Sequence, residues 1–188
     1  MSRPRSSCPN PPVRADPWGE LRGYTDARIA LGRCGVSLPH DQWLRFRLAH
    51  AQARDAVLTS FDAAAVRADL EAAGLRCLEL ASAARHKDEF LTRPDKGRRL
   101  SEAAYAELER FAATPGVAGA DVSVVISDGL SARAVHENAA PFAVAFLERV
   151  RAAGLRAAPV VLVRYGRVAV ADEVASLLRA RLVVILIG

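Results

Sequence analysis

Short apolar runs alternate with amphipathic stretches through the second half of the chain. β-Branched residues dominate three runs of strand length, at 122–126, 159–164 and 182–187. Stretches with helical periodicity separate them and begin near Ser131 and Asp172, each of which can cap a helix N-terminus. Strands that are apolar on both faces and alternate with helices are typical of a parallel sheet covered on both sides. The pattern therefore predicts an α/β fold.

The first half of the chain has a mainly helical pattern. A helix is predicted from Gln42 to about Ser60, with Asp41 as its cap and one apolar face buried. Trp43 and Phe46 lie off the apolar stripe of this helix. Large aromatic side chains on both sides predict that the helix is covered twice, once by its own domain and once by something else.

The pattern after this helix predicts further elements. Asp62 can cap a second helix that ends at Gly74, and a strand is expected at 75–80. The charged stretch 86–99 contains an Arg-Pro-Asp-Lys-Gly turn and is predicted to be a loop, after which Ser101 begins another helix.

The segment around Ser127–Ser131 joins a buried strand to the start of a helix. Ligands of open α/β sheets bind beside such loops, at the carboxyl ends of the strands. The segment has a single glycine, Gly129, and does not fit the dinucleotide fingerprint. On the local pattern alone, a structural turn capped by Asp128 and Ser131 is the favoured interpretation. The helix that follows is expected to pause near Pro141.

These patterns divide the chain into three parts. Residues 1–22 are rich in proline and are predicted to be a disordered leader. Residues 23–116 form a smaller, mostly helical N-terminal region. Residues 117–188 form a Rossmann-like parallel sheet flanked by helices. The last strand has no crossover after it, so we expect this C-terminal domain to be incomplete.

Charge and cysteine usage exclude several classes of protein. The net charge is only +5, and acidic residues interrupt the arginines of the long helix, so nucleic-acid binding is not predicted. Cys8, Cys34 and Cys77 lack metal-site or redox spacing, which favours a reduced, cytoplasmic setting. No apolar run is long enough to cross a membrane, and no secretory signal is present.

The sequence contains no recognisable catalytic machinery. It has no nucleophile elbow, no Walker sequence and no histidine pair with zinc-ligand spacing. We therefore predict no catalytic residue and no metal site. What remains is a binding surface at one sheet edge, built from the loops at Asp128-Gly129, at Gly166-Arg167 and after Gly188.

Distinctive blocks follow one another along the chain from Thr25 to Gly188. They lie at 27–35, 42–57, 90–100, 121–131 and 163–168. Leu-Thr-Arg-Pro-Asp in the third block and Ser-Asp-Gly-Leu-Ser in the fourth are the most distinctive. Together these blocks resemble the small (light) subunit of ethanolamine ammonia-lyase. From this resemblance we expect the chain to be truncated at its C-terminus.

The resemblance implies a function. Members of this family belong to an adenosylcobalamin-dependent enzyme that converts ethanolamine to acetaldehyde and ammonia by radical chemistry. The large subunit is a TIM barrel that holds the substrate, and the small subunit closes over the corrinoid. The resemblance thus implies a hetero-oligomer in the cytoplasm, free or within a bacterial microcompartment.

The resemblance also implies which residues contact the coenzyme. Val168 aligns with the family's cobalamin-contacting valine, and Gly166 and Arg167 lie beside it. Gly166 would let the backbone approach closely, and Arg167 would either reach an amide or phosphate oxygen of the coenzyme or form a surface salt bridge. A later glutamate and cysteine of the family have no counterpart. The alternative is a stand-alone or degraded α/β ligand-binding module without lyase activity.

Overall fold

The computed structural model describes residues 12–188. Contacts group the chain into two compact units that divide between Arg54 and Asp55, and each unit is described by itself. Residues 1–11 of the predicted leader lie outside the described residues. In the remainder of the leader, Arg14 forms an antiparallel bridge with Arg33.

The N-terminal unit contains the short 3₁₀ helix η1 (Gly19–Gly23) and most of α1 (His40–Leu58). The helix begins one residue before Asp41, so the prediction that Asp41 caps it was wrong. The prediction of a buried face was also wrong, because no residue of α1 is buried among the described residues. Its apolar positions are too dispersed around the helix to form one face for a core.

The second unit is built on one parallel sheet. Its strands are β1 (Cys77–Ala81), β2 (Val122–Ser127), β3 (Val160–Arg164) and β4 (Leu182–Ile187). They are ordered β1-β3-β2-β4, and all three pairings are parallel. The α/β class and the parallel sheet predicted from the apolar runs are confirmed.

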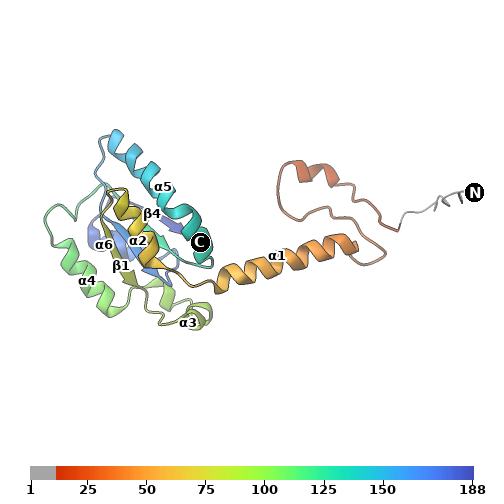
Figure 1. Cartoon of the computed structure of the whole chain (residues 1–188), viewed down its shortest axis with the longest axis horizontal. Coiled ribbons are helices and arrows are strands. Elements are labelled where there is room, and N and C mark those ends of the chain that lie inside the picture. The colour runs from red at the N-terminus through yellow and green to blue at the C-terminus, as the bar shows by residue number, and fades with distance from the viewer. Residues whose placement is uncertain (1–11) are drawn as a thin grey trace, which may run out of the picture. The chain divides into compact units, whose positions relative to one another are not determined.

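Helices cover both faces of this sheet (Figure 1). Their bounds are α2 (Ala63–Ala72), α3 (Lys87–Thr92), η2 (Lys96–Arg98), α4 (Glu102–Ala112), α5 (Ala132–Ala152) and α6 (Val170–Leu178). On one face, Ile126 and Leu162 pack in a core with α2 and α5. On the other, Val125 and Val161 pack in a core with α4 and α6. Each central strand is therefore buried on both sides, as its apolar sequence requires.

Three of the helix caps that the sequence predicts are confirmed. Asp62, Ser101 and Ser131 each accept a hydrogen bond from the backbone N–H three residues on, as N-caps do. Asp172 does not cap α6, which begins at Val170 and holds Asp172 in its first turn. There the carboxylate still lies at the positive end of the helix dipole.

Two other predictions were wrong. The helix after β2 does not pause at Pro141, because α5 runs through it without a break. The buried side chains of α5, such as Ala143 and Leu147, continue on one face past the proline and hold the helix against the sheet. The charged stretch 86–99 is not a simple loop but contains α3 and η2.

None of the helices in the described part of the chain is both long and apolar enough to cross a membrane.

Replacing the exposed proline of α5 tests whether packing overrides its cost. Pro141→Ala restores a donor for the carbonyl of Glu137, and we expect it to raise the free energy of unfolding by about 1–3 kcal/mol. Thermal and urea unfolding followed by circular dichroism measure this change. The reciprocal variant Ala145→Pro, at another exposed position of α5, should lower it by about 3 kcal/mol. A Pro141→Ala midpoint at or below that of the wild type would contradict this interpretation of α5.

Candidate functional site

The carboxyl ends of the strands meet at one edge of the sheet, where the loops after β1, β2 and β3 touch. Because β2 and β3 are neighbours in the sheet, Ser127 and Asp128 at the end of β2 lie against the loop 165–168 that follows β3. Both side chains are buried, at 0% and 1% exposure. The pattern of buried strands thus brings two polar residues into the interior at the candidate site.

Tyr165 is the first residue of the loop after β3, and its φ of 56° is left-handed. For a residue with a Cβ this conformation costs about 1–2 kcal/mol. Two hydrogen bonds hold it: its N–H donates to Asp128 Oδ1 at 2.7 Å, and its carbonyl accepts from Ser82 Oγ at 2.8 Å. This turn is therefore fixed by buried polar groups that follow β1 and β2, the two strands that flank β3.

Gly166 is buried against Ser127. The Ser127 hydroxyl accepts from the Gly166 N–H at 2.9 Å and donates to the Gly166 carbonyl at 3.2 Å. A Cβ at Gly166 would lie 2.7 Å from Ser127 Oγ and 3.0 Å from Val170 Cγ1. Glycine is thus required here by packing against the end of β2.

Arg167 turns back onto the segment after β1. Its N–H donates to the Gly97 carbonyl at 2.7 Å, and its Nη2 donates to the Phe90 carbonyl at 2.8 Å. The guanidinium carbon lies 4.6 Å from the centre of the Phe90 ring, in cation–π geometry. The side chain is therefore held by its own chain and forms no salt bridge within the part of the chain that the structure describes. Its contact with the coenzyme stays a prediction.

Lys87, at the start of α3, links the loops after β1 and β2. Its Nζ donates to the Gly129 carbonyl at 3.0 Å and lies 3.6 Å from Asp128 Oδ2. Burial raises the pKa of the Asp128 carboxyl, while the Tyr165 N–H and the Lys87 ammonium act in the opposite direction. The ammonium thus offsets part of the cost of a carboxylate inside the protein.

Val168 is the exposed member of this loop, with 61% of its surface accessible. It follows three residues whose backbones are each tied to a neighbouring segment. The loop therefore presents an apolar side chain to the outside from a rigid support.

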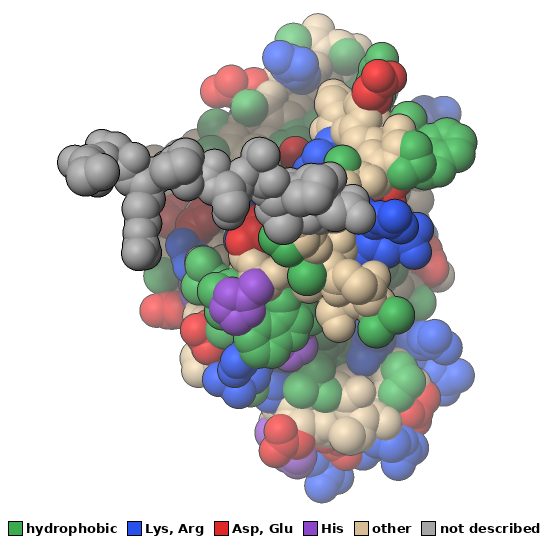
Figure 2. All heavy atoms as spheres, turned by 90° about the vertical axis from the view of Figure 1, so that its right-hand side faces the viewer, with side chains coloured by type: hydrophobic (Ala, Val, Ile, Leu, Met, Phe, Trp, Pro, Cys, Tyr) green, Lys and Arg blue, Asp and Glu red, His purple; other side chains and the backbone are tan. Residues whose placement is uncertain are grey.

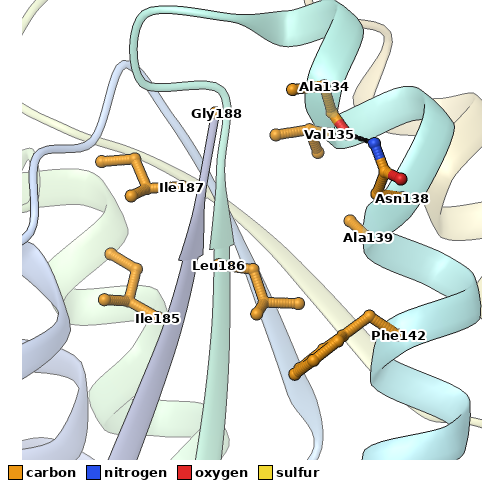
Figure 3. Close-up of a pocket in the computed structure, with 9 residues that line it drawn as sticks. All are labelled: Ala134, Val135, Asn138, Ala139, Phe142, Ile185, Leu186, Ile187 and Gly188. Atoms are coloured by element: carbon orange, nitrogen blue, oxygen red, sulfur yellow. Dashed lines mark hydrogen bonds between the residues drawn. The ribbon is translucent and has the colours of Figure 1, made fainter. Parts of the chain in front are cut away.

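A groove of about 380 Å³ lies beside these loops, between α5 and the last residues of β4 (Figure 3). It is lined by Ala134, Val135, Asn138, Ala139, Phe142 and residues 185–188. Its one polar side chain, Asn138, donates to the carbonyl of Ala134. A groove with this mostly apolar lining suits apolar groups.

The structure brings together the loops that the sequence placed at one edge. Asp128 is bonded to the loop of Gly166 and Arg167, and the Gly188 carbonyl accepts from the Leu130 N–H at 2.9 Å. The segment after β1, which supplies Lys87, Phe90 and Gly97, was missed as part of the site. The sequence did contain an indication of this segment, because block 90–100 is one of the blocks that resemble the family. The sequence does not reveal, however, that β1 lies next to β3.

Comparison with known proteins identifies the family. The family model described as ethanolamine ammonia-lyase light chain matches residues 15–188. The chain belongs to this family. A relative from Ralstonia nicotianae, named ethanolamine ammonia-lyase small subunit, is 56% identical over 178 residues. Relatives of the same name from Pseudomonas putida W619 and Pseudomonas fluorescens SBW25 are 52% and 51% identical.

These matches cover nearly all of this chain but less of its relatives. The alignments include 94–95% of the chain and 65% of each of the three relatives. The chain therefore spans about two thirds of their length, and the three loop segments of the candidate site lie within the part that the family model matches.

The tight fit of Gly166 gives a direct test of the site's geometry. Gly166→Ala forces a Cβ against the buried Ser127 hydroxyl, and we expect it to lower the free energy of unfolding by about 1–3 kcal/mol. Urea unfolding measures the effect. Gly23→Ala is the matched control, because no atom lies within 4 Å of its added Cβ, and it should leave the midpoint unchanged. Equal stability of Gly166→Ala and the wild type would contradict the packing described here.

Proposed function

We propose that the chain is the small subunit of an adenosylcobalamin-dependent ethanolamine ammonia-lyase, which converts ethanolamine to acetaldehyde and ammonia. Family membership supports this function. The observation that locates this function in the structure is the exposure of Val168. This valine lies on a loop that is anchored at the carboxyl ends of a parallel sheet. Cofactors of open α/β folds bind at such edges.

The residues of the loop fit a large cofactor in different ways. Val168 offers exposed apolar surface, which suits the periphery of a corrin ring. Gly166 is buried, and the side chain of Arg167 is engaged with Phe90, so both act by shaping the loop. We therefore assign the direct contact to Val168 and a supporting part to Gly166 and Arg167.

When bound, adenosylcobalamin supplies the radical that starts the reaction, by homolysis of its Co–C bond. The part of this chain is to hold the coenzyme in place and to keep water from it. We expect no side chain of this chain to act as a catalytic acid or base.

We further propose that α1 binds the large subunit that the name of the relatives implies. None of its residues is buried, and Trp43, Phe46 and Leu48 are 42%, 49% and 61% exposed. Arg47 lies over the Trp43 ring at 4.8 Å, so aromatic and cationic groups form one surface. Figure 2 shows apolar, basic, acidic and histidine side chains intermixed on the face of the molecule that it draws. Aromatic and arginine side chains of this kind are enriched at protein interfaces.

Co-expression with the cognate large subunit tests the proposed function. We expect a purified complex that shows the visible spectrum of a corrinoid after incubation with cobalamin and releases acetaldehyde from ethanolamine when adenosylcobalamin is present. Val168→Asp should weaken corrinoid binding by at least about tenfold, because a carboxylate would lose water against an apolar ligand. Leu155→Asp is the matched control, since Leu155 is also exposed but lies just after α5, away from the site.

A complex that binds no corrinoid and shows no activity, beside an active control assembled with a relative of full length, would overturn this function. A chain that stays monomeric and folds cooperatively without the large subunit would favour the stand-alone binding module instead.

A separate experiment tests the proposed binding of α1 to the large subunit. The double variant Trp43→Ala/Phe46→Ala removes large exposed side chains that contact no core, and we expect about a hundredfold weaker association with the large subunit. Its circular dichroism and unfolding midpoint should match the wild type. Gln52→Ala, on the same helix, is the control and should associate normally. Unchanged affinity of the double variant, measured by calorimetry or biolayer interferometry, would exclude α1 from the interface.

A further inference from the structure

The loop that carries Val168 adopts a conformation that its own sequence disfavours. Tyr165 is left-handed with φ 56°, although it is neither glycine nor asparagine. Residues in such conformations persist only where the surroundings hold them, and they concentrate at functional sites.

Two adjacent residues at the end of β2 provide most of the restraint. Asp128 Oδ1 accepts from the Tyr165 N–H at 2.7 Å. The Ser127 hydroxyl bonds both the N–H and the carbonyl of Gly166, at 2.9 and 3.2 Å. Three hydrogen-bonding groups of the loop backbone are thus fixed by Ser127 and Asp128, and the Tyr165 carbonyl between them accepts from Ser82 Oγ.

Neither side chain is available to a ligand. Ser127 and Asp128 are 0% and 1% exposed, whereas Val168 is 61% exposed. Asp128 is itself held in place by Lys87, whose ammonium lies 3.6 Å from Oδ2 and donates to the next carbonyl, that of Gly129. Burying a carboxylate is costly. Here its cost is offset by the backbone N–H and the ammonium that it faces.

We propose that Ser127 and Asp128 are positioning residues for the coenzyme: they never touch it, but they hold the loop in the one conformation that presents Val168. This inference rests on the proposed function. If the loop is released, only a fraction of the molecules presents the binding conformation, and the apparent affinity falls by that fraction. Releasing the loop does not change the rate of the reaction in those molecules that have bound the coenzyme.

The test uses the complex of this chain with its large subunit and three variants. Asp128→Ala removes the acceptor for the Tyr165 N–H. Asp128→Asn keeps an acceptor and removes the charge. Asp121→Ala is the matched control, because Asp121 lies at the opposite end of β2 and also accepts from a backbone N–H, that of Arg156 at 2.9 Å. The readouts are the equilibrium affinity for cyanocobalamin, KM and kcat for adenosylcobalamin, and hydrogen exchange of the Tyr165 and Gly166 amides without corrinoid.

We expect Asp128→Ala to raise the cyanocobalamin Kd and the adenosylcobalamin KM about tenfold, with kcat within about twofold of the wild type. Exchange at the Tyr165 amide should become faster. Asp128→Asn should restore affinity to within about threefold of the wild type, and Asp121→Ala should bind cobalamin normally even if it is less stable. A merely structural role would lower the stability of Asp128→Ala and leave its affinity for cyanocobalamin unchanged.

Wild-type affinity in Asp128→Ala would overturn the positioning role, as would equal loss in Asp121→Ala or no rescue by Asp128→Asn. If Asp128→Ala yields no soluble complex, Ser127→Ala tests the same loop by deleting one hydroxyl, and unchanged affinity and exchange in that variant would overturn the role as well. A wild-type complex that binds no corrinoid would instead overturn the proposed function, so the two failures are distinguishable.

Discussion

The hydrogen bonds from the end of β2 to the loop after β3 fix the geometry of the candidate site. They are possible because β2 and β3 are parallel neighbours, so their carboxyl ends emerge at the same edge. Asp128 can then meet the backbone of Tyr165, and Ser127 that of Gly166. A sheet order in which another strand separated these two would leave a buried carboxylate without its N–H partner, at considerable cost. The conformation of the loop after β3 therefore depends on the order of the strands in the sheet.

The elements of the α/β unit could be predicted from the sequence because their local signals agree with their environment. The apolar runs that became β2, β3 and β4 are buried between two helical layers, which explains their lack of alternation. Asp62, Ser101 and Ser131 were found as caps since capping needs only a side-chain oxygen at the right spacing. The predicted pause at Pro141 was wrong because the packing of α5 on the sheet outweighs the free-energy cost of a proline inside the helix.

Other features depend on contacts that no local pattern encodes. The position of β1 beside β3 places Phe90 and Gly97 against Arg167, and this pairing joins residues far apart in the chain. The sequence also suggested a buried face for α1, since Leu44 and Leu48 repeat at helical spacing. Those leucines are exposed within the described chain, so their spacing does not reflect packing against a core of the described residues.

We propose that the loops at the strand ends of this chain face cobalamin in a complex with the large subunit. Hydrogen exchange of that complex, compared with and without bound cyanocobalamin, tests it most directly. We predict that the corrinoid slows exchange in residues 165–168 and in the adjoining segment 127–131, while exchange in 152–157, near the amino end of β3, is unchanged. Bound corrinoid without any added protection at 165–168 would contradict the assignment of this edge as the coenzyme site.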